Sequence, residues 1–176
     1  MQKIIPFAIF STRRQEEITR IRWDDYQAAN GGDPARVLVR NMKHPGDKIG
    51  NDVWVELTPE ATAYIESMPK EAAEIFPFTT DAISAAFTRA CKMVGINTDE
   101  MEDDERLHFH DLRHDGVSRL FEMGRTIPQA ANVSGHRSWQ SLQRYTHIRK
   151  AGDKYANWKW LPIAAATPRK APPIDG

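Results

Sequence analysis

The pattern of apolar and polar positions predicts a mainly helical chain. Residues 4–10 carry no polar side chain, so they predict a helix that is buried on all sides. Ser11 or Thr12 can cap a second helix, and Glu16 and Glu17 would fall in its first turn, where the helix dipole favours acids. The chain is therefore expected to begin with two consecutive helices.

A hairpin interrupts the helical pattern. Residues 37–39 and 53–57 have the β-branched and aromatic composition of strands. The segment between them contains Pro45 and Gly46, which are turn residues. We predict a β-hairpin with Lys43 at the end of its first strand or in its turn.

Helix signals return after the hairpin. Thr58 followed by a proline starts a helix that should reach about Met68, and Thr80 or Asp81 should cap another that stops at Gly95. The remaining expected elements are a solvated acidic loop at 97–105, helices over 110–123 and 128–133, a helix from Ser138 through Tyr145, and a short element at 158–161.

These elements predict a mainly α fold with a small antiparallel β-sheet, in the α+β class. The 176 residues are enough for one domain with a core, which we place at 1–161. Residues 162–176 are proline-rich and are expected to form a flexible tail. No apolar run reaches the roughly 20 residues of a membrane helix, so no membrane contact is expected.

Charge and histidine content single out one segment. The chain has 24 Lys and Arg against 24 Asp and Glu, but residues 106–150 carry eight basic and three acidic residues. Five of the six histidines lie in residues 107–150. Such clustering suits a site that binds an anion and moves protons near neutral pH. The single cysteine, Cys91, fits a reducing compartment such as the cytoplasm.

Short motifs occur in a defined order along the chain. Arg14 is followed three residues later by Glu17, and Lys43 lies in the expected hairpin. The sequence HDLR then places His110 and Arg113 three residues apart, on one face of a helix. The chain continues with Gly-His at 135–136 and with Tyr-Thr-His at 145–147.

This order of motifs resembles the tyrosine recombinase (phage integrase) family, over nearly the whole chain to about residue 150. The resemblance implies the catalytic-domain fold of that family, without its separate N-terminal DNA-clamping domain. It also implies that the chain acts on a double-stranded DNA recombination site, as a homotetramer on paired sites or as a monomer when isolated. A cytoplasmic, nucleoid-associated location follows. The segment 154–161 is the candidate for exchange between subunits.

The chemistry of these residues suits cleavage of a DNA phosphodiester without metal or other cofactor. Tyr145 would be the nucleophile and would form a covalent 3′-phosphotyrosyl link. Its phenol has an ordinary pKa of about 10, so it needs a base, and His110 can accept its proton.

The other candidate residues would stabilise charge and protonate the leaving group. Arg14 and Arg113 can donate paired hydrogen bonds to the non-bridging oxygens. His136 can donate one more, and Lys43 can protonate the leaving 5′ oxygen, as the hairpin lysine of the family does. The expected catalytic set is thus Arg14, Lys43, His110, Arg113, His136 and Tyr145.

Three departures from the family pattern bear on these assignments. The family has a glycine where this chain has Thr12, and Arg13 stands beside Arg14. The spacing to Glu17 favours Arg14 as the phosphate ligand. A second lysine, Lys48, lies in the same turn as Lys43.

Two other classes of function remain open from the sequence. One is a metal-dependent hydrolase that uses His108, His110 and His114, although these positions do not share one helical face well. The other is a non-enzymatic DNA-binding or assembly module of the same fold. His114 and His147 are expected to support or cap the site rather than to react.

Overall fold

The computed structural model describes residues 2–42 and 51–166. Lys43 and Lys48 lie outside the described residues. With η marking a 3₁₀ helix, the elements in chain order are α1 (Ile4–Ser11), α2 (Gln15–Arg20), η1 (Trp23–Asp25), β1 (Tyr26–Gln27), β2 (Arg36–Met42), β3 (Asn51–Glu56), α3 (Pro59–Glu66), α4 (Thr80–Met93), η2 (Asp103–Glu105), α5 (Asp111–Glu122), α6 (Ile127–Ser134), α7 (Gln140–Gln143) and α8 (Leu161–Ala165).

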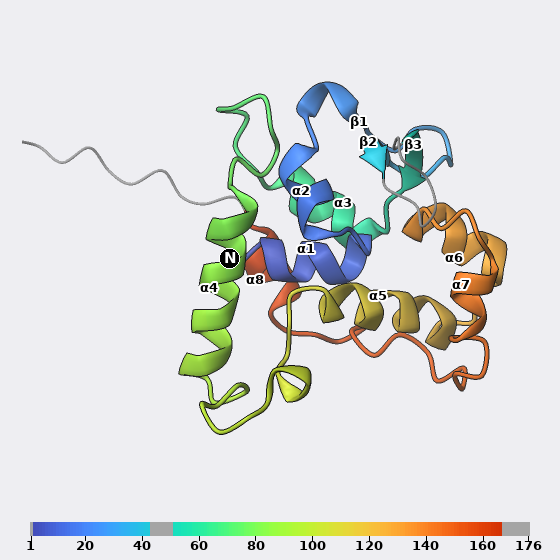
Figure 1. The fold of residues 1–176 in the computed structure, drawn as a ribbon. Coiled ribbons are helices and arrows are strands. Elements are labelled where there is room, and N and C mark those ends of the chain that lie inside the picture. Colours follow the sequence, from blue (N-terminus) through green and yellow to red (C-terminus); the bar gives the residue numbers. More distant parts are fainter. Residues whose placement is uncertain (1, 43–50, 167–176) are drawn as a thin grey trace, which may run out of the picture.

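The sheet has three antiparallel strands in the order β1-β2-β3 (Figure 1). Strands β2 and β3 form the predicted hairpin, in a register that pairs Val37 with Val55 and Val39 with Val53. Strand β1 was not predicted, because it is two residues long and lacks an apolar alternation. The α+β fold class is confirmed.

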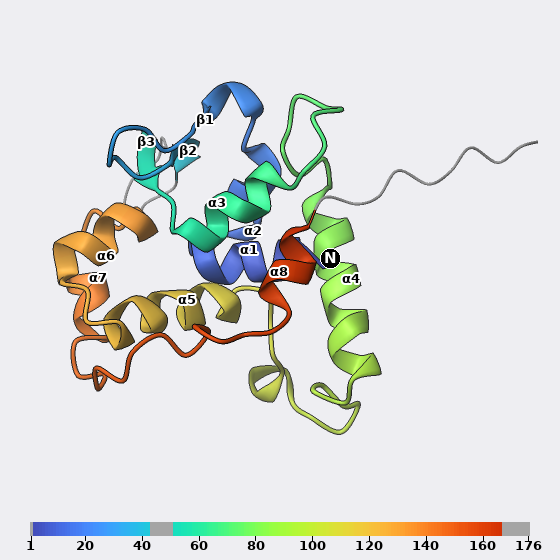
Figure 2. The same ribbon diagram turned by 180° about the vertical axis from the view of Figure 1, so that it is seen from behind.

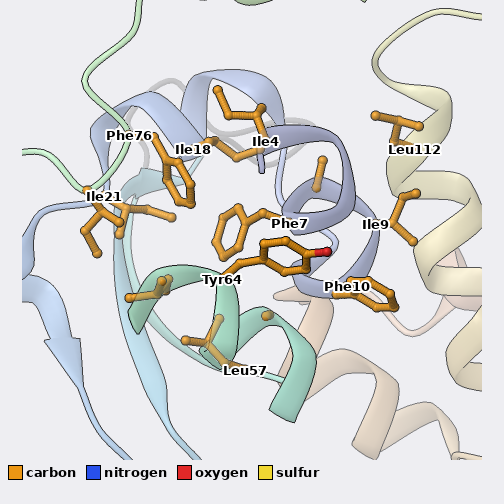
Figure 3. Packing of buried hydrophobic residues seen from close by; sticks show 14 of the residues in the cluster. Ile4, Phe7, Ile9, Phe10, Ile18, Ile21, Leu57, Tyr64, Phe76 and Leu112 are labelled. Atoms are coloured by element: carbon orange, nitrogen blue, oxygen red, sulfur yellow. The ribbon is translucent and has the colours of Figure 1, made fainter. Parts of the chain in front are cut away.

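Helix α1 lies at the centre of the fold, between α3 and α5 (Figures 1 and 2). Its side chains pack in every direction: Phe7 lies 4.6 Å from Phe76 between ring centroids, and Phe10 faces Tyr64 (Figure 3). A helix with neighbours on all sides has no exposed face. This accounts for the unbroken apolar run of residues 4–10.

Helices α1 and α5 approach each other closely at Gly116. Gly116 lies directly against α1, and a Cβ at that position would overlap the carbonyl oxygen of Ile9. Only a residue without a side chain permits this separation. The contact brings the first turn of α5 beside the end of α1, where Thr12, Arg13 and Arg14 follow.

Several helix boundaries differ from those expected. Thr12 adopts a left-handed conformation (φ 56°) as the C-cap of α1, so the chain turns there and α2 begins three residues later, at Gln15. Helix α4 is capped by Thr79, whose side chain accepts from the Ala82 amide, rather than by Thr80 or Asp81. Tyr145 lies beyond the end of α7, because that helix has only four residues.

The segment after Tyr145 runs along α5 and ends in α8, which packs against α3 (Figure 2). Lys154 pairs with Asp115 of α5 at 2.6 Å, and Ala164 is buried. The segment considered for exchange between subunits therefore packs on its own chain. Residues 162–165, which were expected to belong to the tail, are helical as part of α8. Residues 167–176 lie outside the described residues.

Arg119 anchors this segment to the core. Its guanidinium is buried and lies 2.6 Å from both Glu60 of α3 and Asp153. We expect Arg119→Met to reduce the free energy of unfolding by about 3–5 kcal/mol, because it leaves two carboxylates unpaired. Lys154→Met is the control, since its pair is more exposed and is worth about 0–1 kcal/mol. Equal shifts of the two urea midpoints would contradict this assignment.

Among the described residues, no helix has the length and apolar content needed to cross a bilayer.

Candidate active site

Arg13 and Arg14 are adjacent in sequence but differ in environment. The Arg13 guanidinium is fully buried and donates to the carbonyl oxygens of Ser11 and Val133 at 3.1 and 2.7 Å. The Arg14 side chain is 34% exposed and lies 2.9 Å from a Glu17 oxygen. Glu17 also accepts from the Arg14 amide, which closes the first turn of α2. Arg14 is thus the one of the two that is open to a ligand.

Arg113, in the first turn of α5, forms hydrogen bonds with two other segments of the chain. It donates to the carbonyl oxygen of Thr12 and, at 3.1 Å, to that of Ser134. The Thr12 position, where the resemblance expects glycine, has a positive φ of 56°, a conformation that costs an L-residue with a Cβ about 1–2 kcal/mol. The turn at Thr12 aims a carbonyl at Arg113 and leads directly into Arg14.

His136 is positioned by the end of α6. Gly135 terminates that helix in a left-handed conformation (φ 70°). The left-handed backbone favours glycine, and a Cβ there would also lie 2.8 Å from the end of the Met42 side chain, which would have to shift. Nδ1 of His136 lies 2.7 Å from the Ser134 hydroxyl, and its Nε2 lies 3.3 Å from Nη2 of Arg113.

A second hydrophobic cluster, separate from the core around α1, is formed by α5, α6 and α7. Tyr145 belongs to this cluster. Its ring stacks on Phe121 with centroids 5.9 Å apart. Its hydroxyl oxygen lies 2.6 Å from Nδ1 of His114. Packing thus fixes the ring, while the hydroxyl points toward α5 and the cavity that both residues line.

Five of the six residues expected in the site line one cavity of about 510 Å³: Arg14, His110, Arg113, His136 and Tyr145. The sixth, Lys43, lies outside the described residues. A neighbouring cavity of about 220 Å³ shares Arg14, His110 and Arg113. The arginines that line one or both cavities are Arg13, Arg14, Arg20, Arg40, Arg113, Arg137 and Arg144. Three of the basic residues of 106–150, Arg113, Arg137 and Arg144, thus line this site together with arginines from the first helices and from β2.

Burial and positive charge set the protonation states of the site. Desolvation, together with the charges of Arg113 and Arg14, lowers the pKa of His136 to about 3. Desolvation and the neighbouring His114 and Arg113 lower the pKa of His110. Both imidazoles are therefore neutral at pH 7 and each can donate one N–H.

Arg113 and Tyr145 keep their protons at neutral pH. Desolvation and the charge of Arg13 lower the pKa of Arg113 to about 9, which leaves it cationic at pH 7. Burial raises the pKa of Tyr145, against the opposing effects of Arg144 and Arg113. The phenol is therefore protonated and needs a base before it can attack.

Glu17 is the counter-charge of this arginine cluster. Desolvation would raise the pKa of its carboxyl, but the charges of Arg13 and Arg113 and the hydrogen bond from the Arg14 amide lower it overall. An ionised Glu17 holds Arg14 in place and limits the repulsion among the three guanidiniums.

The contact between His114 and Tyr145 was not predicted. The sequence indicated only a supporting role for His114, since the two residues are 31 positions apart. His110, which was expected to take the Tyr145 proton, instead packs edge-to-face with the ring of His114, with centroids 5.0 Å apart. Ser134 also gave no sequence signal, because its contribution comes from a carbonyl and a hydroxyl at the end of a helix.

The arrangement of the histidines does not support the metal-dependent hydrolase. His108 contacts the Asp103 carbonyl at 2.9 Å and lines neither cavity, so it does not converge with His110 and His114. Within residues 2–42 and 51–166, no three side chains of His, Cys, Asp or Glu are placed to hold a metal ion.

Comparison with known proteins decides the family. A model described as the phage integrase family matches residues 2–151. The chain belongs to that family. A relative from Escherichia coli, a shufflon-specific DNA recombinase, is 33% identical over 148 residues, which are 83% of this chain and 34% of the relative. The chain thus spans about a third of the length of this relative.

Solved structures of recombinases share the fold. The XerH site-specific recombinase, in a post-cleavage complex with its palindromic difH substrate, aligns with a TM-score of 0.58 and 18% identity, over 84% of this chain and 42% of that one. A lambda integrase dimer bound to a COC′ core site aligns with a TM-score of 0.59 and 19% identity, over 83% of this chain and 41% of that one. The predicted tyrosine recombinase catalytic-domain fold is confirmed.

Proposed function

We propose that this member of the phage integrase family is the catalytic domain of a site-specific DNA recombinase, formed by residues 1–161. It cleaves and rejoins DNA strands through a covalent 3′-phosphotyrosyl intermediate, without metal. The observation that carries the proposal is the convergence of Arg14, His110, Arg113, His136 and Tyr145 on one cavity, from four separate segments of the chain.

The arrangement of charge matches what phosphodiester cleavage requires. Arg14 and Arg113 both face the cavity, and their guanidiniums can bind the non-bridging oxygens of one phosphate. Neutral His136 can donate a further hydrogen bond to these oxygens. Such donors, fixed before the reaction, stabilise the negative charge that develops in the transition state. Lys43 is the proposed donor to the leaving 5′ oxygen.

The partner that we propose is duplex DNA carrying a recombination site. Seven arginines, of which Arg13 is fully buried, line the two adjoining cavities together with the acids Glu16 and Glu17. Such an excess of positive charge is what phosphate backbones bind. The two solved relatives described above were captured with DNA, XerH with difH and lambda integrase with a core site. Four copies on two paired sites, associated with the nucleoid, complete the proposed assembly.

Covalent capture tests this proposal directly. The full chain is mixed with nicked duplexes of randomised sequence in the presence of a chelator, and the DNA that stays attached after denaturation is amplified. We expect attached DNA that converges on one site over successive rounds. DNA cleavage that leaves no attachment, is lost with the chelator and returns with added zinc would favour a hydrolase. DNA binding with neither cleavage nor attachment would favour a non-enzymatic module.

A further inference from the structure

A second histidine, outside the expected catalytic set, contacts the proposed nucleophile. Nδ1 of His114 lies 2.6 Å from the hydroxyl oxygen of Tyr145, which is within hydrogen-bond distance. Each of the two rings has a further aromatic neighbour. Tyr145 stacks on Phe121, and the ring of His114 lies edge-to-face with that of His110. Neither ring can turn away without losing these contacts.

We propose that His114 orients the Tyr145 hydroxyl and accepts its proton as the phenol oxygen attacks. This role rests on the proposed function, since it requires Tyr145 to be the nucleophile. It leaves His110 for the phosphate, rather than for the proton of the phenol.

The positions of the two histidines support this division. They are four residues apart on α5 and therefore lie on the same face, one turn from each other. His110 lines both cavities, beside Arg14 and Arg113, where the phosphate oxygens are proposed to bind. His114 lines only the cavity that holds Tyr145. One histidine thus faces the proposed phosphate ligands and the other faces the nucleophile.

The protonation of the phenol makes an adjacent base necessary. Burial raises the pKa of Tyr145, so its hydroxyl carries a proton that must leave during attack. A neutral imidazole with its proton on Nε2 offers Nδ1 as an acceptor. The charges that face this pair are Arg113 from α5, Arg14 from the start of α2, and Arg137 and Arg144 from the segments after α6 and α7.

Cleavage moves one proton, forms one bond and breaks one bond. The proton on the Tyr145 hydroxyl moves to Nδ1 of His114, the phenol oxygen forms a bond to phosphorus, and the bond from phosphorus to the 5′ oxygen breaks. The leaving oxygen takes its proton from a separate donor. In rejoining, a 5′ hydroxyl attacks phosphorus and gives its proton back to that donor, and the tyrosyl oxygen leaves and recovers its proton from His114.

His114→Asn separates orientation from proton transfer, because the amide can still accept a hydrogen bond but takes up no proton. We expect the rate of covalent attachment to fall at least about 100-fold, the lower range for loss of a general base, with DNA affinity unchanged. His108→Asn, whose side chain is exposed and outside both cavities, is the matched control.

Two further measurements test the role of His114 even if His114→Asn is unstable. In His114→Ala, added imidazole should restore part of the rate, which a purely structural role would not allow. In the wild type, the nitrogen-15 shift of His114 should show a proton-free Nδ1 that moves on Tyr145→Phe. A protonated Nδ1 would overturn the proposal.

The outcomes separate this role from the proposed function. Attachment by the wild type together with an equal rate for His114→Asn would refute only the role of His114. A wild type that never attaches to DNA would refute both.

Discussion

Tyr145→Phe is expected to abolish covalent attachment to DNA while DNA binding persists. The phenylalanine ring keeps the stacking on Phe121 and the place in the second hydrophobic cluster, so the fold should be unchanged. Only the hydroxyl and its contact with His114 are lost. Removing a covalent nucleophile reduces turnover by about 10⁶-fold in well-studied enzymes, so we expect no detectable attached DNA on a nicked substrate.

Tyr155→Phe is the matched control for this experiment. Its hydroxyl is also partly buried and donates to a single carboxylate, that of Asp115, at 2.8 Å. It lines neither cavity of the site. The control should attach to DNA at the wild-type rate. Attachment that persists in Tyr145→Phe and disappears in Tyr155→Phe would reverse the assignment of the nucleophile.

Arg113→Lys is expected to reduce the rate of attachment by about 10²–10³-fold, the loss seen when one fixed donor to a transition-state oxyanion is removed. Lysine keeps the positive charge but cannot reproduce the planar fork of donors. In the wild type that fork spans the Thr12 and Ser134 carbonyl oxygens and reaches His136. DNA affinity should change much less than the rate, because several other arginines line the same groove.

Arg89→Lys, an exposed position on α4, is the control for the same chemical change. Thermal unfolding of each variant measures any loss of stability separately from the loss of rate. A rate for Arg113→Lys within a few fold of that of Arg89→Lys would contradict a role for Arg113 at the phosphate.

Local sequence patterns predict most of the fold, and the candidate site residues were named from motifs that resemble those of a known family. The buried helix α1 follows from a run without polar residues, and the hairpin follows from two β-rich runs around a turn. Six site residues were named from these motifs, and the five that lie within the described residues line one cavity. Arg14 was preferred over Arg13 from its spacing to Glu17, and the different exposure of the two agrees with that choice.

The features that were missed depend on contacts between distant segments. Nothing in the sequence brings His114 to Tyr145, since the contact arises only when α5 and the segment after α7 pack together. The helical start of the predicted tail likewise depends on tertiary packing, because α8 is held against α3. The N-cap of α2 was misplaced because the turn at Thr12 requires a positive φ, which is unusual for threonine.

The central claim is that the oxygen of Tyr145 becomes bonded to a DNA phosphate. The most direct measurement is to trap the full chain on a suicide substrate, digest the protein and the DNA, and map the modified peptide by mass spectrometry. The account predicts that a residual nucleotide is attached to the peptide that contains Tyr145, at that residue. A nucleotide on any other residue, or trapping that leaves every peptide unmodified, would contradict it.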